Sequence, residues 1–219
     1  MARSREKVNG APRRKSIEIL LSRLDPHSSP KIMLEQYTIP AGLAADLLYW
    51  AGFVHDDLRS RTVVDLGTGS GRLAIGACLF RPELVVGVDI DRSAVMQARR
   101  NASLVNVSVE WIVADIDSIE GAFETAIMNP PFGTRNRHKD VSFLSKAVQI
   151  ANVIYTIHKR STRQFIGTFV KSRSAKIDEL YESVLEIPRS YSFHEKRRHL
   201  VDVDLLRIVS FSGGIRGSS

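Results

Sequence analysis

From residue 62 onward, short apolar runs alternate with segments of helical periodicity, and this alternation limits the possible folds more than any other feature. The runs are six to nine residues long and most end in glycine or a polar residue, which is typical of strands buried on both faces. Alternating strands and helices form parallel sheets, so the pattern predicts an α/β domain with helices on both faces of a sheet. The predicted parallel strands lie at residues 62–67, 83–90, 107–115, 123–129 and 152–159.

Two later segments alternate apolar and polar residues and have no helical segment between them. They span residues 177–187 and 200–211, and their period of two predicts strands. Strands that follow each other without a helix pair antiparallel, so we expect a C-terminal hairpin at the edge of the sheet. The expected fold is therefore a seven-stranded, mostly parallel sheet that ends in this hairpin.

The first 15 residues differ from the rest of the chain in charge and in helix breakers. Six of them are Lys or Arg and only one is acidic, and an Asn-Gly pair and a proline interrupt any helix. This composition predicts a basic, disordered tail over residues 1–15 and one folded domain over residues 16–219. Helical spacing predicts a short helix at residues 17–24 and another at residues 40–54.

The chain of 219 residues carries a net charge of +7. This charge favours a polyanionic partner such as RNA, although a solubilising tail and solvated loops give the same count. No run of 18 apolar residues occurs, so we expect no membrane span. Cys78 is the only cysteine, which excludes an internal disulfide and argues against a cysteine-based zinc site. We therefore expect a cytoplasmic protein with no metal centre.

The segment DLGTGSG, residues 65–71, follows the first predicted strand and begins the next helix. Its glycines allow the backbone to approach a ligand beside a positive helix N-terminus. Their G-x-G-x-G spacing differs from the G-x-G-x-x-G of dinucleotide-binding loops. Asp65, just before the turn, suits a cationic ligand such as a sulfonium with an amino group better than a pyrophosphate. A tight strand–helix turn is the alternative interpretation of the three glycines, Gly67, Gly69 and Gly71.

Two further carboxylates end neighbouring strands. Asp89 ends the second strand, where it can accept hydrogen bonds from ribose hydroxyls, while Asp91 is better placed to cap the next helix. Asp115 ends the third strand and can accept a hydrogen bond from the amine of an adenine ring; a turn cap is its alternative role. Ligands of open α/β sheets bind at these carboxyl ends. Together with the Asp65 loop, the pattern predicts a pocket for S-adenosylmethionine.

The sequence NPPF, residues 129–132, follows the fourth strand beside that pocket. Pro130 and Pro131 each hold the preceding residue in an extended conformation, which makes a rigid turn. This turn can direct the Asn129 side-chain oxygen and the Pro130 carbonyl at the two hydrogens of a planar NH₂ group. Phe132 can stack on the same planar group. The segment therefore predicts methylation of an amine, in which positioning contributes most of the catalysis.

DLGTGSG, GVDID and NPPF resemble the amino-methyltransferase pattern of class I S-adenosylmethionine enzymes. The chain most resembles the methyltransferase-like protein five family, adenine-N6 methyltransferases of small-subunit ribosomal RNA, and its archaeal relatives. The resemblance extends over about residues 31–211. The segments that carry it are LEQY, IMNPPFGT, HKRSTR, YSFH and VDVDLLR.

The resemblance implies a Rossmann-like class I methyltransferase fold with S-adenosyl-L-methionine as cofactor. It implies that Gln36 and Tyr37 line the cofactor site, and that residues 129–132 form the catalytic turn. It also implies a small zinc-binding activator subunit, as in the family's eukaryotic members. The family commonly has Pro-Thr after EQY, whereas this chain has Thr38-Ile39. The remaining cofactor contacts that it implies are Asp65, Gly67, Asp89 and Asp115.

We therefore expect an enzyme that methylates the N6 amine of an adenosine in small-subunit ribosomal RNA. A glutamine-amide protein methyltransferase is the first alternative, but those enzymes usually carry tyrosine in place of Phe132 and a separate N-terminal helical domain. A non-enzymatic RNA-binding assembly factor with a vestigial cofactor site is the second. The intact acidic residues and the intact NPPF argue against it.

A basic run begins at the end of the fifth predicted strand. His158 and Lys159 end that strand, Arg160 and Arg163 follow it, and all four are candidates to contact an RNA backbone. A capping or core position is the alternative for His158.

Overall fold

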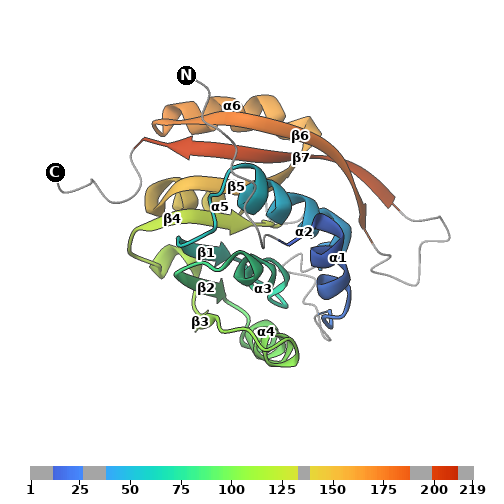
Figure 1. Cartoon of the computed structure of the whole chain (residues 1–219). Helices are drawn as coiled ribbons and strands as arrows, with labels where there is room; N and C mark the ends of the chain where they lie inside the picture. Colours follow the sequence, from blue (N-terminus) through green and yellow to red (C-terminus); the bar gives the residue numbers. More distant parts are fainter. Residues whose placement is uncertain (1–11, 27–37, 133–138, 188–198, 212–219) are drawn as a thin grey trace, which may run out of the picture.

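The computed structural model describes residues 12–26, 38–132, 139–187 and 199–211, which surround a seven-stranded sheet (Figure 1). The strand order is β3-β2-β1-β4-β5-β7-β6. The first five strands pair in parallel, whereas β7 pairs antiparallel with both β5 and β6. The predicted sheet and its C-terminal hairpin are thus confirmed. The strands are β1 (Thr62–Leu66), β2 (Leu84–Asp89), β3 (Glu110–Val113), β4 (Phe123–Met128), β5 (Ala151–Lys159), β6 (Ala175–Ile187) and β7 (His199–Ser210).

Helices cover both faces of this sheet, as the alternation predicted. One face carries α1 (Arg14–Ser22), α2 (Ala41–Tyr49), α3 (Arg72–Ala77) and α4 (Arg92–Leu104). The other carries α5 (Lys139–Ile150) and α6 (Arg163–Ser172). Shorter turns complete the described chain: the π-helical η2 (Trp50–Val54) and the 3-10 turns η3 (Cys78–Phe80), η4 (Ile116–Ser118) and η5 (Arg160–Thr162).

Two apolar cores lie on either side of the sheet. Successive residues of a strand point to opposite faces, so Val63 of β1 belongs to the core under α1–α3 and Val64 to the core under α5 and α6. In the same way, β7 gives Leu205 to the first core and Leu206 to the second. Burial on both faces explains why these strands appear in the sequence as continuous apolar runs.

The folded part begins earlier than the sequence predicted. Helix α1 starts at Arg14, so Arg14 and Lys15, which we assigned to the tail, are helical. The reason is a set of contacts that sequence spacing does not reveal. The Arg14 guanidinium donates to Asp46 of α2 at 2.7 Å and to the Gly42 carbonyl at 3.2 Å. These bonds join the first turn of α1 to α2.

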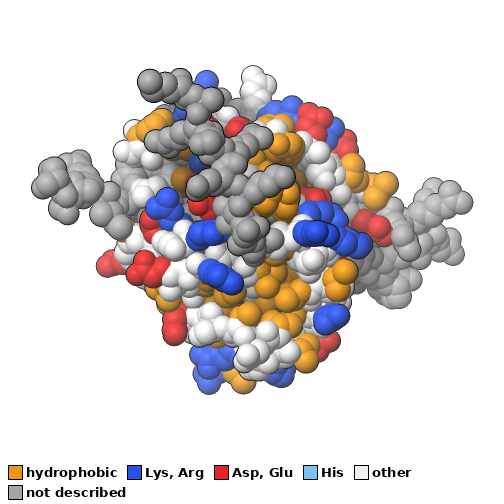
Figure 2. Space-filling view, viewed as in Figure 1, with side chains coloured by type: hydrophobic (Ala, Val, Ile, Leu, Met, Phe, Trp, Pro, Cys, Tyr) orange, Lys and Arg blue, Asp and Glu red, His pale blue; other side chains and the backbone are white. Residues whose placement is uncertain are grey.

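Charges of both signs are spread over the face of the molecule that Figure 2 shows. In the view of Figure 2, Lys and Arg side chains lie at several separate places, with Asp and Glu side chains between them. Among the helices that the structure describes, none is long and apolar enough to cross a membrane.

Candidate cofactor and substrate site

The sheet order places the predicted site at one point. Strand β1 lies between β2 and β4, and the chain order reverses between β1 and β4. Ligands of open α/β sheets bind next to such a reversal, at the carboxyl ends of the strands. The loop at 65–71 leaves β1 there, and Asn129 follows the end of β4 one residue beyond the Leu66–Met128 pair. The glycine loop and the NPPF turn therefore lie side by side.

The glycines of this loop serve different purposes. Gly69 has φ of 56°, and a Cβ added there would meet no atom of the described residues within 4 Å, so within this part of the chain its backbone borders open space. A Cβ at Gly67 would instead meet the Phe143 ring at 2.7 Å, and one at Gly71 would meet Trp111 at 2.8 Å. Gly69 is thus the position where the loop leaves room for a ligand, while the other two glycines permit close packing.

Asp65 is buried in an incomplete hydrogen-bond environment. Its Oδ2 accepts from Thr68 Oγ1 at 2.6 Å and from the Ala74 amide at 3.0 Å. Its Oδ1 is buried and has no hydrogen-bond partner among the described residues. Burial raises the pKa of this carboxyl to about 7. A buried carboxylate oxygen without a donor fits a site that receives a positively charged group from a ligand.

Asp89 and Asp91 make different contacts at the end of β2. Asp91 caps α4, since its Oδ1 accepts from the Ser93 amide at 3.0 Å. Asp89 is buried at the end of β2 and reaches back to the glycine loop, where its Oδ2 accepts from the Gly69 amide at 2.8 Å. Its Oδ1 accepts from the Asp91 amide at 2.8 Å. The helix cap at Asp91 is confirmed, and Asp89 lies beside the loop where a ribose contact is predicted.

Asp115 lies further out. Its Oδ1 accepts from the Asp117 amide at 3.0 Å and so caps the turn η4. The structure thus shows the turn cap that we gave as the alternative. This bond occupies Oδ1, one of the two carboxylate oxygens of Asp115. The contact between Asp115 and an adenine amine remains a prediction. Gln36 and Tyr37, the other two predicted cofactor contacts, lie outside the described residues.

The NPPF turn is packed against the first core. Pro130 is buried, while Asn129, Pro131 and Phe132 are half-buried. The Phe132 ring packs against the core cluster under α1–α3, and Lys159 Nζ lies 5.5 Å from its centroid. Packing against the core therefore holds the turn in place. Three of its side chains stay partly exposed, as a substrate site requires.

His158 belongs to the core, which was the alternative interpretation. It is 2% exposed, and its Nε2 lies 3.1 Å from Thr156 Oγ1. Burial lowers the pKa of His158 to about 4, so the ring is neutral at neutral pH. A buried, neutral side chain cannot bind an RNA phosphate, and the prediction of a backbone contact is wrong for this residue.

Two polar residues of the site were not found from the sequence. Asn101 of α4 is 1% exposed, and its Nδ2 donates to the carbonyls of Ser70 and Asp25, each at 2.9 Å. It thereby joins the glycine loop to the segment after α1. Thr68 holds the Asp65 carboxylate, as described above. The one available signal was an asparagine in the buried stripe of α4 that includes Ala94 and Ala98.

Comparisons with known proteins agree with this geometry. The model of the family "Methyltransferase small domain" matches residues 48–153. An uncharacterized protein of Methanocaldococcus jannaschii is 38% identical over 90% of this chain and 94% of its own. The rRNA N(6)-adenosine-methyltransferase METTL5 of Danio rerio is 37% identical over 89% of this chain and 98% of its own.

A solved structure extends the likeness to three dimensions. It belongs to a Pyrococcus horikoshii protein proposed to be an RNA methyltransferase, and superposes with a TM-score of 0.84 at 33% identity. The match covers 91% of this chain and 98% of that one. The fold is thus that of the class I methyltransferases, as expected. The similarity to METTL5 extends over nearly the whole of both chains, and this chain belongs to the METTL5 family of methyltransferases.

Proposed function

We propose that this protein transfers a methyl group from S-adenosyl-L-methionine to the N6 amine of an adenosine in small-subunit ribosomal RNA. The observation that carries the proposal is the position of the turn at 129–132, directly beside a loop whose buried carboxylate oxygen has no hydrogen-bond partner in the described part of the chain. The rRNA N(6)-adenosine-methyltransferases among its relatives support the substrate.

The residues of the loop fit the cofactor. The Asp65 carboxylate can hold its positively charged amino-acid end, and the open space at Gly69 admits it close to the backbone. Asp89, next to the Gly69 amide, is placed for the ribose hydroxyls. Gln36, Tyr37 and Asp115 complete the proposed contacts. When bound, the cofactor supplies a methyl group on a positively charged sulfur.

The NPPF turn would prepare the amine. The Asn129 side-chain oxygen and the Pro130 carbonyl accept hydrogen bonds from its two hydrogens, which favours a pyramidal nitrogen with an available lone pair. Phe132 stacks on the adenine ring. The amine becomes strongly acidic only after alkylation, so the site needs no strong base before attack. Orientation and hydrogen bonding therefore supply most of the rate enhancement.

The proposal includes a partner, a location and a domain organisation. The partner is a small zinc-binding activator that covers the edge strand β3, where Ile112 and Val113 are 39% and 47% exposed. Leu104, at the end of α4 beside this edge, is 64% exposed. The location is the cytoplasm, which suits the unpaired Cys78. A single methyltransferase domain after the tail is supported by the continuous seven-stranded sheet.

The function is tested by identifying the methylated group. Unmodified small-subunit ribosomal RNA is incubated with the protein and isotope-labelled cofactor, digested to nucleosides and analysed by mass spectrometry. We expect label in N6-methyladenosine. Label on a ring carbon or a ribose hydroxyl would contradict an amine mechanism, and label found only on a protein glutamine would favour the first alternative. If label appears only when the activator subunit is added, the activity requires that subunit.

A further inference from the structure

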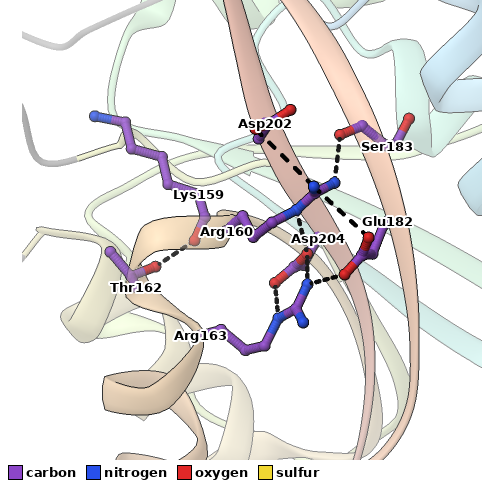
Figure 3. A network of polar contacts seen from close by, with 8 residues as sticks. All are labelled: Lys159, Arg160, Thr162, Arg163, Glu182, Ser183, Asp202 and Asp204. Carbon is purple, nitrogen blue, oxygen red and sulfur yellow. Dashed lines mark hydrogen bonds and ion pairs between the residues drawn. The ribbon is translucent and has the colours of Figure 1, made fainter.

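The basic residues Lys159, Arg160 and Arg163 at the end of β5 do not act as one surface. Arg163 makes a bidentate contact with Asp204, through Nε at 2.7 Å and Nη2 at 2.6 Å (Figure 3). Its Nη2 also donates to Glu182 at 2.6 Å. Arg160 Nη1 lies 3.6 Å from Glu182, and its Nε lies 3.6 Å from Asp204. Both arginines therefore form ion pairs with carboxylates of the terminal hairpin.

These ion pairs are structural. The Asp204 side chain is only 1% exposed, so removal of its arginine partners would leave a buried negative charge without compensation. Hydrogen bonds to Asp204 and Glu182 raise the pKa of Arg163 above its ordinary value. Asp202 lies 3.9 Å from Arg160 as a third carboxylate, so acids outnumber the two arginines here. The network by itself would repel a phosphate.

Lys159 is arranged differently. It makes no ion pair with any described residue, and it points away from the network in Figure 3. Its Nζ lies 5.5 Å from the centroid of the Phe132 ring. Its backbone is fixed, because it pairs with Val203 of β7 and its carbonyl accepts from Thr162 Oγ1 at 2.8 Å. The Lys159 ammonium is thus held beside the aromatic residue of the NPPF turn.

We infer that Lys159 is a positioning residue for the RNA substrate, whose ammonium group binds the phosphate next to the adenosine that stacks on Phe132. The inference rests on the proposed function. The phosphate of a nucleotide lies only one ribose away from its base, and the long lysine stem can carry its charge over that distance. The contact with the ring is weak at a partly exposed site, so the ammonium can turn from the ring to a phosphate.

The surrounding ion pairs limit the place at which a phosphate can bind. Because Arg160 and Arg163 are paired with acids, they offer little attraction to a phosphate that enters at the end of β5. The same pairs fix the turn η5 and the start of α6, and so fix the point from which Lys159 extends. One phosphate is therefore bound in a defined place beside Phe132, rather than anywhere along a broad basic surface.

The test compares the full chain with Lys159→Met, which retains much of the stem and removes the charge, and with Lys159→Arg, which restores the charge. Lys171→Met, an exposed lysine at the other end of α6, is the matched control. Each protein is titrated with a short RNA that contains an unpaired adenosine, at several salt concentrations. Methyl transfer is measured at limiting and at saturating RNA, and S-adenosylhomocysteine affinity by calorimetry.

We expect Lys159→Met to weaken RNA binding about tenfold at low salt, and to reduce the logarithmic salt slope by about 0.7, the value for one phosphate contact on a single strand. The loss should appear as a higher KM for RNA, with kcat and S-adenosylhomocysteine affinity nearly unchanged. Lys159→Arg should recover most of the affinity, and Lys171→Met should behave like the wild type.

An unchanged salt slope in Lys159→Met would overturn the inference, and so would a loss of S-adenosylhomocysteine affinity, which would indicate damage to the fold of the site. These results are distinct from a failure of the proposed function. If wild-type protein methylates adenosine while Lys159→Met keeps its slope, only the role of Lys159 is wrong. If wild-type protein places no methyl group on adenosine, the function itself is wrong and the inference fails with it.

Discussion

Asp65 is the residue whose surroundings say most about the cofactor site. A carboxyl group with a pKa of about 7 is part-protonated at neutral pH, and only its ionised form attracts a positively charged ligand. Cofactor binding should therefore favour the ionised form and release a proton. We expect S-adenosylhomocysteine affinity to fall by up to about tenfold for each pH unit below 7 and to level off above it.

Calorimetry in buffers one pH unit below and one above neutrality measures this dependence. Asp65→Asn is the comparison, because it retains the shape and removes the charge. Its affinity should be low at every pH, with no slope. In the unliganded wild type the sign of the stability effect is opposite: the folded-state pKa is raised, so the contribution of Asp65 to stability is lost as pH rises from about 4 towards 7. A pH-independent affinity in the wild type would argue against a role for Asp65 in binding.

Asn129 is the residue whose side chain we expect to bind the substrate amine. Asn129→Ala removes one of the two oxygens that grip the amine. We expect a methyl-transfer rate at least about 100-fold lower, as for the loss of one preorganised hydrogen-bonding group. S-adenosylhomocysteine affinity should change little. Tritiated methyl transfer to ribosomal RNA fragments, with cofactor binding measured in parallel, distinguishes the two effects.

Phe132 provides the matched variants for that experiment. Phe132→Ala should weaken RNA binding through lost stacking, on the order of 1–3 kcal/mol per base. Phe132→Tyr keeps the ring and should retain most activity. Near-normal turnover in Asn129→Ala would rule out the proposed grip on the amine.

At the scale of elements, the ion-pair network determines how the terminal hairpin joins the parallel part of the sheet. Asp204 of β7 is buried opposite His158 of β5 and contacts both arginines that begin η5 and α6. Glu182 of β6 contacts the same arginines but is 52% exposed. An exposed ion pair contributes little to stability, whereas loss of a buried carboxylate leaves its partners uncompensated.

We therefore expect Asp204→Asn to lower the melting temperature by several degrees and Glu182→Gln to change it by about one degree or less. Both substitutions remove one negative charge, so the pair isolates the effect of burial. Thermal unfolding followed by circular dichroism measures it. Equal shifts in the two variants would contradict the structural role assigned to Asp204.

The same network shows where prediction from sequence reaches its limit. The order of strands and helices could be predicted from local periodicity, because burial on one or two faces determines the pattern of apolar and polar residues among sequence neighbours. Arg163 and Asp204 are separated by 41 positions and meet only once β7 has paired with β5. In the sequence, the arginine was therefore indistinguishable from a surface cation. Asn101 was missed for the same reason, since its partners Ser70 and Asp25 lie in other parts of the chain.

Element boundaries were less predictable than element types. Strand β3 ends at Val113 rather than Asp115, because it pairs with β2 alone and the pairing stops at Asp89. The helix predicted at 40–54 exists, but its last turn is the π-helical η2. A Cβ at Gly52 in that turn would meet the Phe80 ring at 2.3 Å, so the turn packs unusually close to η3. Such tertiary fits leave no periodic signal in a sequence.

At the scale of the whole molecule, the topology assembles a site from residues far apart in the chain. The reversal of strand order between β1 and β4 brings the loop at 65–71 beside the turn at 129–132. Lys159 joins them because β5 is the next strand in the sheet. The motifs themselves were predictable from sequence, because each depends on a short stretch of backbone. That the motifs lie close together could be predicted from one rule, that the carboxyl ends of parallel strands meet at the same edge of a sheet.

Net charge is the remaining property of the whole molecule, and part of it is already paired. Arg14 contacts Asp46 and Lys15 lies 3.2 Å from Glu18, so these two cations of the basic N-terminus belong to the folded part. Within residues 1–11 the cations are Arg3, Arg5 and Lys7, opposed by Glu6. With Arg13, which is exposed just before α1, these three are the N-terminal charges best suited to a general attraction for RNA.

Deletion of residues 1–11 should therefore weaken RNA binding mainly at low salt, without affecting S-adenosylhomocysteine affinity. If all three cations contact phosphates of a single strand, the logarithmic salt slope should fall by about 2. Fluorescence anisotropy with a labelled RNA over a range of salt concentrations measures both quantities. A longer deletion that includes Arg14 should also lower the melting temperature, because it removes the contacts of α1 with Asp46 and Gly42. Should the shorter deletion leave affinity and slope unchanged, the N-terminus would act only as a solubilising tail, and the attraction for RNA would have to come from Lys159 and the other basic residues of the folded part.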